Sequence, residues 1–197
     1  MLYPVSYTHL DVYKRQGMRN ALKIVGKKIE EAKIVVSGAG ASAQSCTKLY
    51  IALGAKRENI VMIDSKGVIR TDRPNLDERK AFFATDREGI YTLADAIQGA
   101  DLFLGLSQPG VLTPEMVQKM APNPVVFALA NPEPEIRYEV AKAARPDVLM
   151  ATGRSDYPNP VSYTHLTSRA TLTLWMCATS CATSSSFAIR TSMLPSR

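Results

Sequence analysis

The chain has 197 residues with 24 basic and 18 acidic side chains, a formal net charge of +6 and 46% hydrophobic residues, which is enough for one domain with a sizeable core. No stretch reaches about 18 apolar residues, and no basic N-terminal region precedes an apolar one, so the sequence predicts neither a membrane span nor a signal peptide. The three cysteines form no C-x-x-C motif, and we expect a reducing, cytoplasmic setting.

The same seven-residue word, PVSYTHL, stands at residues 4–10 and again at residues 160–166. We interpret it as adaptor-like sequence, because a structural repeat would not copy one word to two borders only. Residues 167–197 contain 13 Ser or Thr and no Asp, Glu, Lys or Gly, which indicates a shifted reading frame; a Ser/Thr-rich disordered tail is the alternative. We therefore predict non-native ends at 1–16 and 160–197, a domain at 17–159, and proteolytic trimming to that domain.

The predicted domain is nearly neutral and poor in metal-binding side chains. Without the ends it carries 19 basic and 17 acidic residues, a net charge of +2, which gives little support for nucleic-acid binding. Both histidines, His9 and His165, belong to the repeated word, and Cys46 is the one cysteine between the ends. Histidine-based catalysis and a Cys/His metal site are therefore not expected.

The first elements of the domain surround a glycine-rich turn. Met18, Leu22, Val25 and Ile29 recur at helical spacing and predict an amphipathic helix. The apolar run Ile34-Val35-Val36 predicts a buried strand, and the sequence SGAGASA follows it directly. A second helix then runs to Leu53, before Gly54, with Cys46, Leu49, Tyr50 and Leu53 facing the sheet.

This order of strand, glycine turn and helix is typical of dinucleotide-binding proteins. Gly38 allows the tight turn, Gly40 lets the backbone approach a pyrophosphate, and Ala43 allows close packing of helix and strand. The helix N-terminus offers free N–H groups to phosphate. An ordinary tight turn is the alternative interpretation of the motif.

A second strand at residues 60–63 ends in Asp64, which lies 24 residues after Gly40. This is close to the spacing of about 20 residues at which an acidic side chain accepts from the adenosine ribose. Ser65-Lys66-Gly67 is too short for a parallel crossover. We therefore predict that Val68 and Ile69 turn back as a short antiparallel strand.

Helices and strands alternate through the rest of the domain, which predicts an α/β fold with a Rossmann-like, doubly wound, mostly parallel sheet. A loop is expected at 71–88, with a helical turn at 76–83. Helices are expected at 93–97, from residue 114 after an N-cap at Thr113, and at 134–143. Strands are expected at 101–107, 125–130 and 147–152. Ligands of such sheets lie at the carboxyl ends of the strands. The residues expected there are Gly38–Ala43, Asp64, Ser107, Asn131 and Gly153–Asp156.

Several long motifs resemble the C-terminal nucleotide-binding domain of bacterial malic enzymes. They are VGKKIEEAKIVVSGAGASA, IDSKGVI, GADLFLGLSQPGVLTPEMV, FALANPEPEI and ATGRSDYPN, and together they extend over about residues 17–159. The resemblance implies an NAD- or NADP-dependent oxidoreductase that oxidises malate and decarboxylates the product to pyruvate and CO₂ with Mg²⁺ or Mn²⁺. It also implies a homo-oligomeric intact enzyme and a Rossmann variant with one antiparallel strand.

The resemblance also assigns roles to residues at the glycine turn and at the strand ends. It implies pyrophosphate binding by Gly38, Gly40, Ala41, Ser42 and Ala43, adenosine ribose contacts from Asp64, Ser65 and Lys66, and contacts to the nicotinamide ribose and malate from Asn131. Ser107 is predicted to contact the cofactor because of its position at a strand end.

The choice between the two cofactors depends on the loop after the second strand. Asp64 favours NAD, because a carboxylate repels a 2′-phosphate. Lys66 could pair with that phosphate, and Arg70 and Arg73 follow in the same loop. The SKG loop resembles family members that use NADP, so Lys66→Ala should weaken NADP more than NAD.

Other residues of the family are missing from this chain. Members carry a catalytic tyrosine, a lysine and three carboxylate metal ligands upstream of the segment that matches Gly17, and a substrate-binding asparagine in an NN pair where Pro160 follows Asn159 here. We therefore expect no catalytic residue and no metal ligand in this chain and no activity of the fragment alone. Asp95 and Asp101 are interpreted as solvated or capping carboxylates.

Two alternatives stay open at this point: a non-catalytic dinucleotide-binding or assembly module, and an amino-acid dehydrogenase-type nucleotide domain. Gene sequence beyond both borders would discriminate between them and a malic enzyme.

Overall fold

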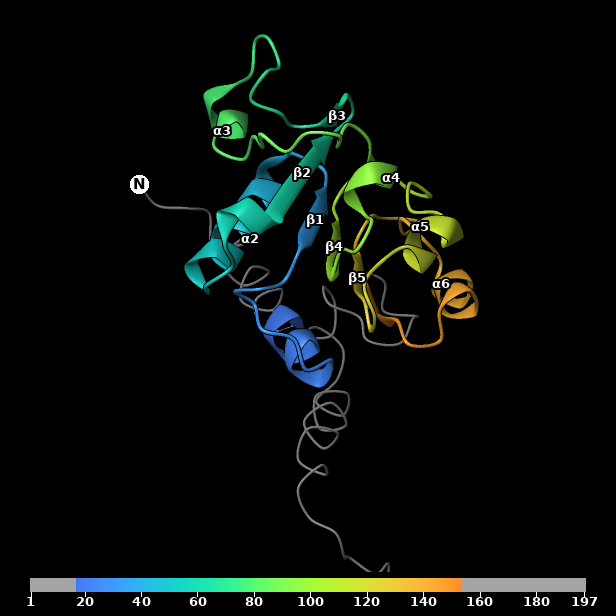
Figure 1. The fold of residues 1–197 in the computed structure, drawn as a ribbon. Helices are drawn as coiled ribbons and strands as arrows, with labels where there is room; N and C mark the ends of the chain where they lie inside the picture. The colour runs from blue at the N-terminus through green and yellow to red at the C-terminus, as the bar shows by residue number, and fades with distance from the viewer. Residues whose placement is uncertain (1–16, 154–197) are drawn as a thin grey trace, which may run out of the picture. The chain divides into compact units, whose positions relative to one another are not determined.

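The protein is described by a computed structural model over residues 17–153, and the interpretations of residues 1–16 and 154–197 lie outside this range. A six-stranded sheet with the order β3-β2-β1-β4-β5-β6 forms its centre (Figure 1). Five of these strands run parallel to one another: β1 (Ile34–Ser37), β2 (Ile60–Asp64), β4 (Leu102–Gly105), β5 (Val125–Ala128) and β6 (Leu149–Thr152). The sheet changes direction of growth between β1 and β4, as in a doubly wound fold.

The short strand β3 (Gly67–Val68) pairs antiparallel with β2, with Ile63 opposite Val68 and Asp64 opposite Gly67. Gly67 has a φ of +106°, a conformation that suits glycine in a tight turn. The predicted fold class, with one antiparallel strand, is therefore confirmed, although that strand lies at Gly67–Val68 rather than at the predicted Val68 and Ile69.

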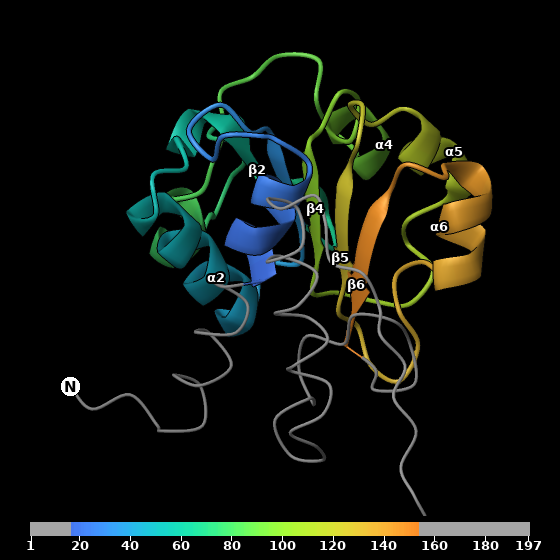
Figure 2. The ribbon, with the colours of Figure 1, turned by 90° about the horizontal axis from the view of Figure 1, so that it is seen from below.

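Helices cover both faces of the sheet (Figure 2). The helical residues 17–24 and α2 (Ala41–Ala52) lie on one face. The other face carries α4 (Leu93–Ala96), α5 (Pro114–Gln118) and α6 (Tyr138–Ala144). The short η1 (Arg57–Asn59) precedes β2, and α3 (Glu78–Ala81) lies within the charged loop that follows β3.

Side chains of each parallel strand alternate between two hydrophobic clusters, one for each face. On β1, Ile34 and Val36 belong to the cluster under α2, whereas Val35 belongs to the cluster under α5 and α6. On β4, Phe103 joins the second cluster between two leucines of the first. Burial on both faces explains why these strands are continuous apolar runs rather than alternating ones.

The helix α2 buries one face against the sheet. Ala43, Cys46 and Tyr50 are buried, and Leu49 and Leu53, which were also expected to face inward, are partly buried. Thr47, which was not predicted to face inward, is buried as well. Its hydroxyl donates to the Ala43 carbonyl at 2.7 Å, so the polar group is satisfied within the helix.

Two predicted helices have different boundaries in the structure. The first ends at residue 24, because Gly26 adopts a φ of +70° and the Lys27 amide donates to the Leu22 carbonyl, which closes the helix end. The helix predicted from residue 134 begins only at Tyr138. The carbonyls of Pro134 and Glu135 accept from the amides of Gly110 and Leu112, so they are not available to a helix.

None of the helices in the described part of the chain combines the length and apolar character needed to cross a lipid bilayer. Cys46 is buried and forms no disulfide within the described residues.

Candidate dinucleotide-binding site

The glycine turn after β1 is fixed between the neighbouring strands. The Gly38 amide donates to the Ile63 carbonyl on β2 at 2.8 Å, and the Leu106 amide donates to the Ser37 carbonyl at 2.8 Å. Gly38 has a φ of +114°, and a methyl group there would lie 2.5 Å from the Leu106 oxygen. The turn therefore requires glycine at position 38 for its own backbone.

The second glycine of the motif has a different environment. Gly40 is the N-cap of α2, with φ −75° and ψ 178°, and a methyl group on it would meet nothing within 4 Å. No side chain caps the helix, and its first turn contains no acidic residue. Among the described residues, no side chain occupies the N-terminal amides of this 12-residue helix, and such uncapped amides can bind phosphate.

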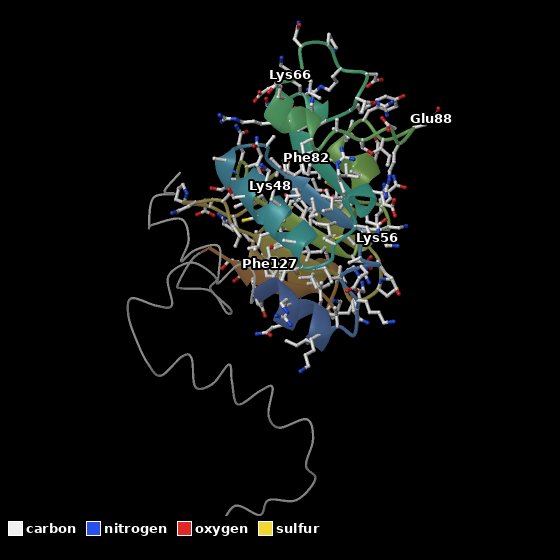
Figure 3. All side chains as sticks on the ribbon, turned by 90° about the vertical axis from the view of Figure 1, so that its left-hand side faces the viewer. Lys48, Lys56, Lys66, Phe82, Glu88 and Phe127 are labelled. Carbon is white, nitrogen blue, oxygen red and sulfur yellow. The ribbon has the colours of Figure 1, made fainter. Side chains whose placement is uncertain are left out.

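At the end of β2, the carboxylate of Asp64 is surrounded by cations. Its Oδ1 accepts from both terminal nitrogens of Arg73 at 3.1 Å and from the Lys66 amide at 2.9 Å. Its Oδ2 accepts from Lys80 Nζ at 3.0 Å. Ser65 and Lys66 are exposed in the adjoining turn, where Figure 3 labels Lys66. The Asp64 carboxylate thus has two basic side chains as partners, Arg73 and Lys80, and receives a backbone hydrogen bond from Lys66.

These contacts keep Asp64 ionised. Burial by itself raises the pKa of Asp64, but the hydrogen bonds from Lys80, the Lys66 amide and Arg73 outweigh it and hold the pKa below its ordinary value. Asp64, Arg73 and Lys80 together have a net charge of +1, which opposes the repulsion that an isolated carboxylate would exert on a phosphate.

The ends of β4 and β5 meet at a buried carboxylate. Ser107, just beyond β4, is exposed, and its hydroxyl lies 2.8 Å from that of Ser37. Asn131, just beyond β5, is exposed and forms a cis peptide bond with Pro132. Beneath them, Glu135 accepts from the Ser107 amide at 3.1 Å and from the Ala130 amide at 3.0 Å, with its side chain fully buried.

The structure therefore brings the predicted site residues to one edge of the sheet, at the carboxyl ends of β1, β2, β4 and β5. Of the expected group at 153–156, only Gly153 is described, and its amide donates to the Ala128 carbonyl at 3.3 Å. Asp95 caps α4 together with Thr92, and Asp101 pairs with Lys27 at 2.7 Å. Within residues 17–153, no group of three His, Cys, Asp or Glu side chains could hold a metal ion.

Two residues of the site, Lys80 and Glu135, were not predicted from the sequence. Lys80 belongs to a charged surface segment, DERK, and nothing in that pattern distinguishes it from its neighbours. Glu135 belongs to the FALANPEPEI motif, where it directly follows Pro134, and membership of this motif is the one signal in the sequence that points to it.

Comparisons with known proteins agree on one family. The family model described as "Malic enzyme, NAD binding domain" matches residues 14–167. An NADP-dependent malic enzyme of Halomonas elongata is 58% identical over 146 residues, which are 74% of this chain and 34% of the relative. An NAD-dependent malic enzyme of Rhizobium meliloti is 54% identical over 144 residues, which are 73% of this chain and 19% of the relative.

The solved structures agree with the sequence matches. The crystal structure of Entamoeba histolytica malic enzyme aligns with a TM-score of 0.71 and 38% identity, over 77% of this chain and 33% of that one. The chain thus spans between 19% and 34% of the length of these relatives.

Proposed function

The chain belongs to the family of malic enzyme NAD-binding domains, and we propose that it binds NADP as part of an enzyme that oxidatively decarboxylates malate to pyruvate and CO₂. The domain proper is residues 17–159. The observation that carries the choice of NADP is the contact of Asp64 with Arg73 and Lys80, at 3.1 Å and 3.0 Å.

The binding scheme follows the geometry of the sheet edge. The amides of Gly40, Ala41, Ser42 and Ala43 at the start of α2 would bind the pyrophosphate, with Gly38 holding the turn. Asp64 and Ser65 would contact the adenosine ribose. Arg73, Lys80 and Lys66 would bind the 2′-phosphate, because charge-assisted hydrogen bonds from several cations outweigh one carboxylate that they already neutralise.

The remaining half of the cofactor would extend toward β4 and β5. Ser107 would contact it, and Asn131 would approach both the nicotinamide ribose and malate. When bound, the nicotinamide supplies the hydride acceptor. Mg²⁺ or Mn²⁺ belongs to the intact enzyme in this proposal, and the described residues offer it no ligand set. The intact enzyme would be a cytoplasmic homo-oligomer, and a reduced, buried Cys46 suits a reducing compartment.

A cofactor titration tests the proposal. The parent chain should bind NADP more tightly than NAD. Lys80→Ala should weaken NADP at least about tenfold more than NAD, because it removes a charge-assisted hydrogen bond to the 2′-phosphate; Lys66→Ala should have a smaller selective effect. Lys56→Ala removes an exposed lysine before β2 and should change neither affinity. An equal loss for both cofactors would contradict 2′-phosphate recognition by these side chains.

A turnover assay tests the second part of the proposal. The chain alone should not reduce NADP or NAD in the presence of malate with Mg²⁺ or Mn²⁺, because the described residues provide neither a metal ligand set nor a histidine. Malate-dependent reduction by the purified chain would mean that catalytic groups lie within it.

A further inference from the structure

Glu135 joins two loops of the sheet edge through a single carboxylate. Oε1 accepts from the Ser107 amide at 3.1 Å, in the loop after β4, and Oε2 accepts from the Ala130 amide at 3.0 Å, in the loop after β5. Ser107, which carries the first amide, is exposed, and so is Asn131, which follows Ala130. Glu135 itself is completely buried. The carboxylate therefore supports exposed residues without facing the ligand.

The backbone of β4 is shaped to receive this carboxylate. A methyl group at Gly105 would lie 2.4 Å from Glu135 Cδ, so only glycine leaves the necessary room. Ser107 is held a second time by the hydroxyl contact with Ser37 on β1, at 2.8 Å. Three strand ends, those of β1, β4 and β5, are thus linked through Ser107 and Glu135.

Burying the Glu135 carboxylate costs desolvation free energy, and packing alone gives no reason for a carboxylate at this position. Within the described residues, no Lys or Arg pairs with Glu135, and its hydrogen bonds come from backbone amides. Burial raises the pKa of Glu135, and the amides of Ala130 and Ser107 oppose this shift. An apolar side chain would fill the space without the desolvation penalty, so the gain lies in how the two loops are held.

We propose that Glu135 is a positioning residue for the nicotinamide half of the cofactor, acting through the backbone of Ser107 and Ala130. The proposal rests on the proposed function. In a doubly wound sheet the adenine half lies over β2 and the pyrophosphate at the turn after β1, so the other half lies over the ends of β4 and β5. Glu135 bonds to these two ends, and its loss should affect that half of the ligand selectively.

The test compares NADP with 2′,5′-ADP, which contains the adenine half alone, in the full 197-residue chain. Glu135→Gln keeps the shape and one acceptor but turns an NH₂ group toward an amide donor. NADP affinity should fall at least about tenfold, while 2′,5′-ADP affinity changes less than about twofold. Glu133→Gln alters a partly exposed glutamate of the same loop and should change neither affinity.

Equal losses for the two ligands, or no loss for NADP, would overturn the proposal.

Amide hydrogen exchange gives a second measurement that needs no variant. In the parent chain, NADP should slow exchange at the amides of Ser107 and Ala130 below the rate in the free chain, and 2′,5′-ADP should not. The amide of Phe127 on β5 serves as the control and should exchange at an unchanged rate. Equal slowing by both ligands would overturn the proposal. If neither ligand binds the parent, the proposed function fails. In that case, fast exchange at the amides of Ser107 and Ala130 in the free chain would also overturn the role of Glu135 as a positioning residue.

Discussion

Two glycines of one motif, Gly38 and Gly40, have separate physical reasons to be glycine. Gly38 has a positive φ, and a methyl group would meet the Leu106 oxygen at 2.5 Å. Gly40 has an ordinary φ of −75° and open space around its α-carbon. The fold requires the first glycine, whereas the second is left free for a ligand to approach.

Alanine substitutions should separate these two roles. Gly38→Ala combines a strained φ with a backbone clash and should lower the free energy of unfolding by about 2–3 kcal/mol. Gly40→Ala should leave that free energy within about 1 kcal/mol of the parent but weaken NADP binding, because the methyl group enters the space of the pyrophosphate. Urea unfolding and cofactor titration of both variants measure this. Normal NADP affinity in Gly40→Ala would contradict the placement of the pyrophosphate.

At the scale of elements, the loop after β3 is fastened to the end of β2 by ion pairs. Arg73 and Lys80 reach back to Asp64, and Arg57 of η1 donates to the carbonyls of Phe82 and Ala84. The loop is charged but is also anchored in the core, because two of its own residues, Phe83 and Ala84, are buried. Asp64 therefore has a structural role in addition to its place in the cofactor site.

The stability contribution of Asp64 should depend on pH. Its pKa is lowered in the folded chain, so the stabilisation is present above the ordinary pKa of about 3.9 and is lost as the pH falls through the lowered folded value. Asp64→Asn should cost about 1–2 kcal/mol at pH 7 and progressively less below about pH 4. Urea unfolding at several pH values checks this, with Glu88→Gln, an exposed acid of the same loop, as the control. A cost that persists unchanged at pH 2 would contradict the ion-pair explanation.

The sequence predicted elements well where local rules decide them. A three-residue turn cannot form a parallel crossover, which is why the antiparallel β3 was foreseen. The start of α6 was wrong by four residues, because a distant loop takes the carbonyls of Pro134 and Glu135. The contacts of Asp64 were missed for a similar reason. Its partners Arg73 and Lys80 lie 9 and 16 residues further along the chain, and hydrophobic periodicity does not predict contacts between charged side chains across a loop.

At the scale of the whole molecule, the proposed cofactor site extends over the ends of four strands, so binding should stabilise the entire domain. NADP at about 100 times its Kd should raise the free energy of unfolding by about 2.7 kcal/mol, which corresponds to roughly 5–10 °C in Tm. Calorimetry of the full chain measures the shift, and Gly40→Ala at the same NADP concentration should show less of it. An unchanged Tm at saturating NADP would contradict binding to the folded domain.

The edge of the sheet at β3 has a consequence for how copies of the chain meet. An exposed edge strand normally presents a row of unpaired N–H and C=O groups that recruits strands from other molecules. Here that row is only two residues long, and the Val68 amide already donates to the Tyr91 carbonyl at 2.9 Å. The same carbonyl would lie 2.7 Å from a methyl group at Gly67, so the segment at 91 closely covers the edge. Strand-by-strand aggregation is therefore disfavoured from this side of the sheet.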